Sequence, residues 1–468
     1  MIFIRGARQL LTLRGPAPRR GVRFGDLGLI RDGSVLVDGE KIREVGSTRR
    51  IENLAAARSA TMIDATGRVV LPGFVDSHTK PLFTSPPMRE VPPGAARAAR
   101  RRPDVAADTN KLAERLLQTV SPKALRLRSR RWTAHFAAHG TTTIEIRSGW
   151  GLNLERELKS LRLARALQGD PIDVAPAFLA AVSTSGPDAD PEDALEHCLQ
   201  VMLPAVRRRR LSPVCDVDCD PSAFHLKRGR RVLEAARQLG FRLKVQSGRT
   251  APCGASTLAV EMNAVSVDDL RLIEDAEIDT LARSPTIATL LPAVAYERGS
   301  AGFAPARQLL DRGAAVALAS GFAPDRCPAL SMPLVLSLAC TWMRMLPEEA
   351  ISAATINGAA ALGRSHLLGS LEPGKQADLT IFDVADYREL PYYFGTNLCV
   401  MTMKKGEIIH WAPVLGDPPL PIAPELGPVP RSPHAEVRGN TERTILSPRI
   451  VNNACDRRSS GRPGVWAA

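Results

Sequence analysis

The sequence predicts a (β/α)₈ TIM-type barrel accompanied by a small β-sandwich domain, and three observations support this α/β fold class. The chain has 468 residues, which suits one large barrel plus an accessory domain. Strand-like apolar runs alternate with helix-like segments through residues 71–365, which implies parallel strands joined by right-handed crossovers. Short strands and turns occupy both flanks, 1–70 and 366–412.

The three parts of the chain differ in their local patterns. Within residues 1–70, turns at Asp32-Gly33 and Asp38-Gly39 join alternating strand-like runs. The barrel segment contains strand-like runs such as GTTTIEI and FRLKVQ, each followed by a helix-like stretch. Short strands return in GSLEPGKQADLTIFD and CVMTMKKGEIIH, and we expect the two flanks to pair into one composite β domain. Residues 413–468 are rich in proline and polar residues, so we expect a disordered tail.

Composition and charge restrict the function classes. The net charge is +13, and segments 89–131 and 203–231 carry the excess of Lys and Arg. A solvated basic surface is the favoured interpretation, with an acidic partner as the alternative. Nucleic-acid binding is not expected, because no aromatic side chains are interleaved with the charges. The eight cysteines form no C-x-x-C pair, which favours a reduced, cytoplasmic setting. No apolar run is long enough to span a membrane.

Several long segments resemble a known family. VVLPGFVDSHT at 69–79, GTTTIEIRSGWGLNLERELKSLR at 140–162 and SMPLVLSLACTWMRMLPEEAISAATINGAAALG at 331–363 are similar to the imidazolonepropionases of the amidohydrolase superfamily. The resemblance covers roughly residues 20–412 and implies a barrel of the metal-dependent hydrolase type. In that family one divalent ion, Zn or Fe, activates a water that opens the imidazolone ring to formiminoglutamate in histidine degradation.

The resemblance also locates the positions of the family's metal ligands, and most of them differ here. His78 matches the first histidine of the His-x-His motif, whereas Lys80 replaces the second. Gln246 stands in the position of the third metal histidine, and Gly321 in that of the metal aspartate. One ligand of four remains, so His78 is a remnant, and we expect no metal cofactor. Lys80 and Gln246 are predicted ligand contacts instead.

The family's proton-transfer and substrate positions have changed as well. Arg249 stands where the family has a catalytic acid, and Asp269 where it has a histidine. Arg89, Arg147 and Trp150 occupy positions implied to contact the substrate. We also expect Lys80 to form an ion pair with Asp269, which would put a protein cation in the place of the metal.

Three functional hypotheses follow from these residues. The first is an imidazolonepropionase-like protein without normal metal-dependent activity, which binds a small acidic or imidazolone-like ligand. The second is an active hydrolase of cyclic amides with a rebuilt, metal-independent site. The third is a non-catalytic scaffold that binds an acidic partner. Analogy with the family implies a homodimer.

Overall fold

The structure is a computed structural model of the chain. It describes residues 1–82, 117–149, 154–180, 190–219, 226–247, 251–299, 302–324 and 326–412. Within these ranges no helix combines the length and apolar character needed to cross a membrane.

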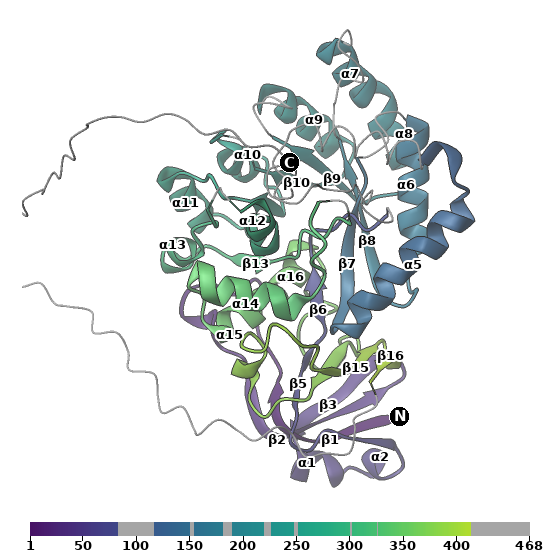
Figure 1. Ribbon diagram of the computed structural model, residues 1–468, viewed down its shortest axis with the longest axis vertical. Helices are drawn as coiled ribbons and strands as arrows, with labels where there is room; N and C mark the ends of the chain where they lie inside the picture. Colours follow the sequence, from purple (N-terminus) through teal and green to yellow (C-terminus); the bar gives the residue numbers. More distant parts are fainter. Residues whose placement is uncertain are drawn as a thin grey trace, which may run out of the picture. The chain divides into compact units, whose positions relative to one another are not determined.

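A nearly closed barrel of eight parallel strands forms the larger part of the fold (Figure 1). Each strand pairs with the next along the chain, in the order β6 (Phe74–Asp76), β7 (Thr141–Arg147), β8 (Asp173–Leu179), β9 (Val214–Asp218), β10 (Arg242–Gln246), β11 (Ser266–Asp269), β12 (Ile287–Leu290) and β13 (Val316–Leu318). At the seam between β13 and β6, Gly321 N donates to His78 O at 3.1 Å and Lys80 N to Phe322 O at 2.7 Å.

Helices surround the barrel strands and make the crossovers between them (Figure 1). They are α5 (Pro122–Ala138), α6 (Leu154–Ala166), α7 (Pro191–His197), η2 (Cys198–Met202), α8 (Leu203–Arg208), α9 (Leu226–Gln238), α10 (Ala255–Glu261), α11 (Asp275–Ala282), α12 (Pro292–Arg298), α13 (Ala306–Asp311), α14 (Met332–Met343), α15 (Pro347–Ala354) and α16 (Ile356–Ala361). The local sequence determines where some of these helices begin. Ser121 accepts a hydrogen bond from Ala124 N ahead of Pro122, so α5 begins with a capping serine and a proline.

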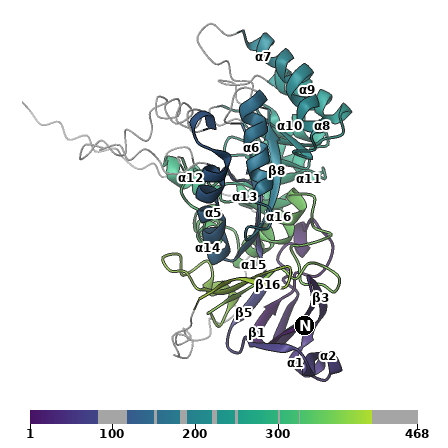
Figure 2. The same cartoon turned by 90° about the vertical axis from the view of Figure 1, so that its right-hand side faces the viewer.

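A second sheet of eight strands combines both flanks of the chain (Figure 2). The N-terminal flank supplies β1 (Ile2–Leu11), β2 (Leu29–Asp38), β3 (Lys41–Ser47), β4 (Thr61–Asp64) and β5 (Val69–Pro72), with helices η1 (Gly21–Arg23), α1 (Thr48–Glu52) and α2 (Ala55–Arg58). The C-terminal flank supplies β14 (Leu379–Phe382), β15 (Cys399–Lys404) and β16 (Glu407–Trp411), with η3 (Tyr387–Glu389) between β14 and β15. The flanks meet where β5 pairs with β14. The predicted fold class is therefore confirmed.

Buried polar contacts join the flanking sheet to the barrel. Lys404 Nζ at the end of β15 lies 2.8 Å from Asp173 Oδ2 at the start of β8, and 2.6 Å from Asp378 Oδ2 beside β14. Thr402 Oγ1 donates to Ala137 O in the last turn of α5 at 2.7 Å. The sheet therefore contacts the barrel at the end where its strands begin.

One turn predicted from the sequence is wrong. Asp38-Gly39 does connect β2 to β3, but Asp32-Gly33 lies inside the continuous strand β2. Asp32 takes a φ of +46°, and the register with β1 shifts between Ile4 and Ala7, opposite this part of β2. A Cβ at residue 33 would lie 2.4 Å from Leu10 Cβ, so a glycine is needed there for close packing of the strands. The Asp-Gly pair marks an irregularity in the strand rather than a chain reversal.

Candidate functional site

Charged and polar side chains project into the barrel from four of its strands, toward the mouth where the strands end. Glu145 and Arg147 come from β7, Asp216 from β9, Lys244 and Gln246 from β10, and Asp268 from β11. Residues two apart on a strand share a face, so each pair on β7 and β10 points to the same side. All of these side chains are buried.

Arg147 lies at the centre of this group, and we call the group the Arg147 network. Its Nε donates to Glu145 Oε1 at 2.7 Å, its Nη1 lies 3.0 Å from Asp216 Oδ2, and its Nη2 donates to Asp268 Oδ2 at 2.5 Å. Burial disfavours the charged form, but the three carboxylates outweigh it and raise the pKa of Arg147. A ligand anion would have to displace one of these carboxylates to reach the guanidinium.

Lys244 adds a second buried cation to the Arg147 network. Its Nζ contacts Glu145 Oε2 at 2.7 Å and the Ser77 carbonyl oxygen at 3.0 Å, and it lies 3.6 Å from Asp268 Oδ2. Burial opposes ionisation of Asp268, yet Lys244 and Arg147 together lower the pKa of this carboxyl. For Asp216 burial prevails over Arg147 and raises the pKa to about 6. Two cations thus face three carboxylates inside the barrel.

His78 contacts the Arg147 network through both ring nitrogens. Nδ1 lies 2.9 Å from Asp268 Oδ2, and Nε2 lies 3.4 Å from Arg147 Nη1. Burial, followed by the charge of Arg147, lowers the pKa of His78 to about 3, so the ring is neutral at pH 7. A neutral ring that donates from Nδ1 to the carboxylate has its free lone pair on Nε2. An arginine N–H faces that lone pair, which is the atom through which such a histidine would bind a metal.

Gln246 is brought next to the same guanidinium. Its Oε1 lies 3.4 Å from Arg147 Nη1, and the residue is 7% exposed. The structure thus brings together His78, Arg147 and Gln246 from the residues singled out in the sequence. Arg89, Trp150 and Arg249 lie outside the described residues.

Asp269 does not form the ion pair expected from the sequence. Its carboxylate accepts from Arg271 Nε at 2.6 Å and from Arg271 Nη2 at 3.2 Å. Asp269 has a φ of +81°, and the next residue, Leu270, is also in the left-handed region. The expected pairing with Lys80 was wrong because Asp269 closes the strand and turns its carboxylate toward a local arginine. Lys80 itself follows β6 and is half-buried.

A second buried carboxylate lies beside His78 at the seam of the barrel. Asp76 accepts a hydrogen bond from Ser320 N at 3.0 Å and another from Ser320 Oγ, and the backbone N–H of His78 lies 3.4 Å from Asp76 Oδ1. Burial raises the pKa of Asp76 to about 7, although the hydrogen bonds from Ser320 oppose this effect. Asp76 therefore exchanges its proton near neutral pH.

Gly321 lies where the resemblance places a metal-binding aspartate, and the surrounding packing favours glycine. Its φ is +66°, and an added Cβ would lie 2.3 Å from Val294 Cγ2. Gly321→Asp is therefore expected to lower the free energy of unfolding by about 2–3 kcal/mol, from backbone strain plus overpacking. Chemical denaturation measures this change.

The matched control for Gly321→Asp is Gly313→Asp. Gly313 also has a positive φ, +89°, but nothing lies within 4 Å of its added Cβ. The control should cost only the strain, about 1 kcal/mol. Equal losses at the two positions would contradict a packing effect of Val294.

Several members of the site were missed in the sequence. Glu145, Asp216 and Lys244 lie on strands that the sequence predicted, and Asp76 lies within the motif GFVDSHT. Asp268 lies on β11, in a segment whose sequence pattern had indicated a helix. The signal that could have found them is the two-residue period of a strand, since Glu145 shares a face with Arg147 and Lys244 with Gln246. Among the described residues, no group of three or more His, Cys, Asp and Glu side chains could hold a metal ion.

Comparisons with known proteins agree with this fold. The model of the Amidohydrolase family matches residues 253–409. The imidazolonepropionase of Geobacillus kaustophilus (strain HTA426) is 38% identical over 415 residues, which are 87% of this chain and 97% of that protein. The imidazolonepropionase of Solibacter usitatus (strain Ellin6076) is 39% identical over 408 residues, 86% of this chain and 97% of that protein.

Solved structures show the same architecture at lower identity. The atrazine chlorohydrolase of Arthrobacter aurescens TC1, in a mutant complexed with zinc and atraton, has a TM-score of 0.66 at 18% identity, covering 89% of this chain and 97% of that one. An adenosine deaminase from Xanthomonas campestris with bound zinc has a TM-score of 0.63 at 16% identity, covering 88% of this chain and 93% of that one. The resemblance found in the sequence is confirmed: the chain belongs to the imidazolonepropionase family of the amidohydrolase superfamily.

Proposed function

We propose that this chain is a member of the imidazolonepropionase family that no longer hydrolyses imidazolone propionate by a metal-dependent route. Its remaining role is to bind a small acidic or imidazolone-like ligand at the barrel mouth without turnover. The observation that carries the proposal is the contact between Arg147 Nη1 and His78 Nε2 at 3.4 Å. A guanidinium N–H faces the lone pair that a metal would need.

The donor set also argues against a resident divalent ion. A catalytic zinc site uses three protein ligands plus a water. Of the four family positions, His78 alone keeps its donor type. Lys80 is a cation, Gln246 offers a weak amide oxygen toward Arg147, and Gly321 has no side chain. These residues do not fit the ion, so we derive no hydrolytic step that requires one.

The ion pairs around His78 are a second argument against a bound metal ion. Arg147 is completely buried beside His78, and Lys244 lies 3.6 Å from the carboxylate that accepts from the same histidine. A divalent ion bound to His78 Nε2 would have to displace the Arg147 guanidinium, which faces that nitrogen at 3.4 Å. Glu145, Asp216 and Asp268 are all engaged in ion pairs with these cations, so their use as metal ligands would break those pairs.

Positive charge near the mouth supports binding of an acidic ligand. Lys80 follows β6 and is half-buried. The sequence predicts further contacts from Arg89 and Arg249. A carboxylate is recognised well by such cations through charge-assisted hydrogen bonds.

Metal analysis and an activity assay test this function together. Full-length protein, purified without chelator, is expected to contain fewer than about one zinc or iron ion per ten chains. It should not turn over imidazolone propionate with or without added zinc or iron. Calorimetry should nevertheless detect binding of imidazole propionate, an analogue whose ring lacks the carbonyl group that is attacked in hydrolysis. The Geobacillus kaustophilus relative, purified in parallel, is the control for the assay.

Two outcomes would contradict the proposal in different ways. One tightly bound ion per chain together with turnover would show that the metal-dependent route survives. Turnover that persists after chelation, in protein free of bound metal, would instead favour the rebuilt, metal-independent hydrolase.

A further inference from the structure

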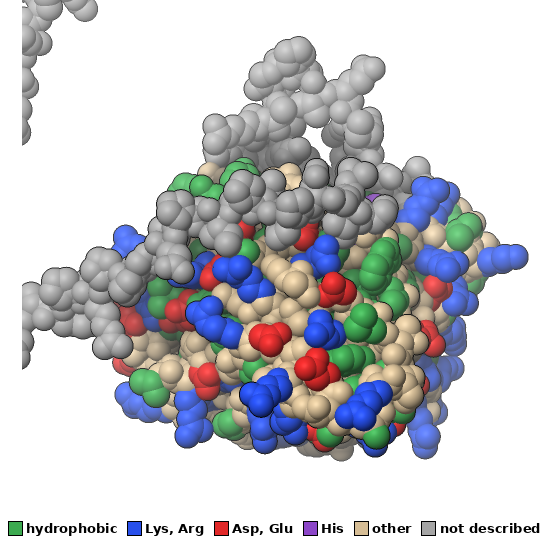
Figure 3. Space-filling model, turned by 90° about the horizontal axis from the view of Figure 1, so that it is seen from below, with side chains coloured by type: hydrophobic (Ala, Val, Ile, Leu, Met, Phe, Trp, Pro, Cys, Tyr) green, Lys and Arg blue, Asp and Glu red, His purple; other side chains and the backbone are tan. Residues whose placement is uncertain are grey.

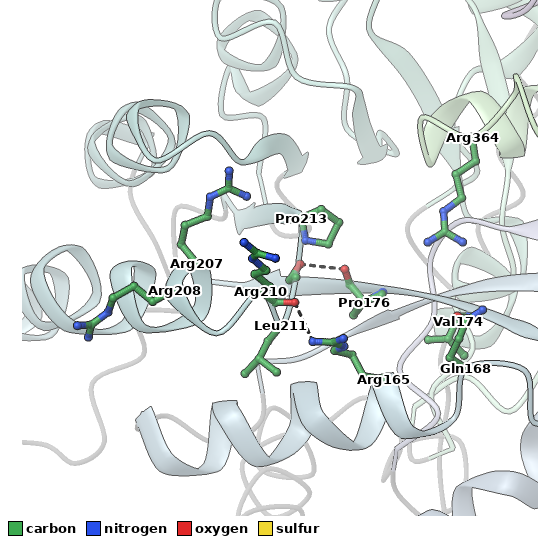
Figure 4. Close-up of a pocket in the computed structure, with 11 residues that line it drawn as sticks. Arg165, Gln168, Val174, Pro176, Arg207, Arg208, Arg210, Leu211, Pro213 and Arg364 are labelled. Atoms are coloured by element: carbon green, nitrogen blue, oxygen red, sulfur yellow. Dashed lines mark hydrogen bonds between the residues drawn. The ribbon is translucent and has the colours of Figure 1, made fainter.

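A pocket lined by arginines opens at the end of the barrel opposite the mouth (Figure 4). Its volume is about 920 Å³, within the range of pockets that bind small molecules. Val174 and Pro176, near the start of β8, and Ser212 and Pro213, just before β9, lie in its wall. His78 and the Arg147 network belong to the other ends of the strands. The pocket thus opens at the opposite end of the barrel from the mouth, and Arg364 adjoins the base of the Arg147 network, because it lines a smaller cavity together with Glu145 and Lys244.

Five arginines line this pocket, and we call it the arginine pocket. They are Arg165, Arg207, Arg208, Arg210 and Arg364. Figure 4 shows Arg165 and Arg210 close together on one side, with Arg364 extending toward the pocket from the other. The side chains come from α6, from the end of α8 and the turn after it, and from the residues after α16.

Local contacts hold some of these side chains in place. Arg165 Nη1 donates to the Arg210 carbonyl oxygen at 3.0 Å, which fixes α6 against the turn after α8. Arg210 itself takes a φ of +51°. The Arg207 guanidinium carbon lies 5.8 Å from the centre of the Phe241 ring, as in a cation–π contact. Apolar residues also line the arginine pocket, among them Leu211, which is buried.

Within the described residues none of the five arginines forms an ion pair with a carboxylate at contact distance, although Asp173 and Glu145 lie close enough to Arg364 for their charges to oppose the lowering of its pKa by burial. Arginines elsewhere form such ion pairs: Arg228 and Arg231 on α9 both contact Glu192, at 2.8 and 2.9 Å. The face in Figure 3 likewise shows Lys and Arg interspersed with Asp and Glu. Neighbouring arginines that lack such ion pairs repel each other, which is unfavourable unless an anion binds among them.

Arg364 is the most informative member of the arginine pocket. It is half-buried, yet within the described residues its guanidinium makes no hydrogen bond or ion pair. Burial lowers its pKa. The charges of Asp173 and Glu145 oppose this effect, but neither carboxylate contacts the guanidinium directly. A partly desolvated cation with free donors gains from an anion, because charge-assisted hydrogen bonds are about twice as strong as neutral ones.

We propose that the arginine pocket binds a small polyphosphorylated anion. Phosphate oxygens match the planar, bidentate donors of arginine, and several phosphates in a chain can engage arginines from both sides of the pocket. The apolar floor of Leu211, Pro213 and Val174 can pack against an attached apolar group. Phosphate sites of TIM barrels usually lie at the C-terminal ends of the barrel strands, whereas this pocket lies at their N-terminal ends. The inference does not depend on the function proposed for the mouth.

Calorimetric titration of the full-length protein tests this site, with sodium tripolyphosphate as the probe at about 0.1 M salt. Saturable binding is expected, weakened about tenfold or more by Arg165→Gln/Arg210→Gln and by Arg364→Gln. The exposed pair Arg207→Gln/Arg208→Gln is a further variant for the case that Arg364→Gln does not fold. The matched control is Arg228→Gln/Arg231→Gln, which removes the same charge from α9 and should change the affinity less than about twofold.

Further ligands distinguish the possible sources of the phosphates. ATP that binds more tightly than tripolyphosphate would identify a nucleotide, and equal affinities would identify the phosphate chain alone. AMP and citrate should bind more weakly than either. Lack of saturable binding, or an equal loss in the α9 control, would overturn the proposal. So would tighter binding of a single-stranded oligonucleotide that depends on the same arginines, because it would indicate a nucleic-acid surface.

Discussion

Asp268→Asn should lower the free energy of unfolding by about 3–5 kcal/mol, the usual cost of breaking a buried ion pair. The carboxylate accepts from three donors: Ser266 Oγ on Oδ1 at 2.8 Å, and His78 Nδ1 and Arg147 Nη2 on Oδ2. An asparagine amide must turn its NH₂ toward one of these donor sets. It also removes the charge that balances Arg147 and Lys244. Urea denaturation at pH 7 measures the loss.

The control for Asp268→Asn is Asp311→Asn on the surface. Asp311 pairs with Arg307 at 2.9 Å, but its side chain is 64% exposed. Its replacement should change the free energy of unfolding by less than about 0.5 kcal/mol. If the two substitutions had similar effects, the Arg147 network would not contribute to stability as its geometry indicates.

Asp76→Asn is expected to remove a pH-dependent destabilisation of the wild-type protein. The pKa of Asp76 is about 7 in the folded state against 3.8 for an ordinary aspartate. Between these values the folded chain retains a proton that the unfolded chain has released, so the stability of the wild type falls as the pH rises through this window. Such a difference in pKa corresponds to about 4 kcal/mol.

The measurement for Asp76→Asn compares both proteins at pH 4 and pH 8. The free energy of unfolding of the variant, relative to wild type, should increase by up to about 4 kcal/mol between these values. Taking this difference cancels the contributions of Asp216, which acts in the same direction, and of His78, which acts in the opposite one. A relative stability that stays constant with pH would mean that Asp76 does not titrate in this range.

The fold was predictable because strands and helices leave periodic patterns of apolar residues in the sequence. Strand-like runs such as GTTTIEI and FRLKVQ became β7 and β10, and the flanking runs became the second sheet. The error at Asp32-Gly33 has a physical cause. An Asp-Gly pair favours positive φ, which serves a hairpin turn and an irregular strand equally well.

The site was predictable only at positions that a known motif marked. The resemblance directed attention to Asp269, but the neighbouring Asp268 is the residue that contacts His78 and Arg147. Adjacent residues of a strand face opposite sides, so a motif that is aligned correctly can still point to the wrong carboxylate. The partner of a buried charged side chain lies on another strand, often far away in sequence. A local sequence pattern therefore does not reveal which ion pairs form.

The pairing of the two flanks has a consequence for synthesis. Gln9 Nε2 contacts Asp386 Oδ2 at 2.9 Å across 377 positions of the chain, and β5 has β14 as its neighbour. During translation the N-terminal strands emerge first and keep an unpaired edge until nearly the whole barrel has been made. Contacts so distant in sequence form slowly, because closing the intervening loop costs entropy. The nascent chain therefore exposes this edge to the ribosome surface and to chaperones for longer than any strand of the barrel.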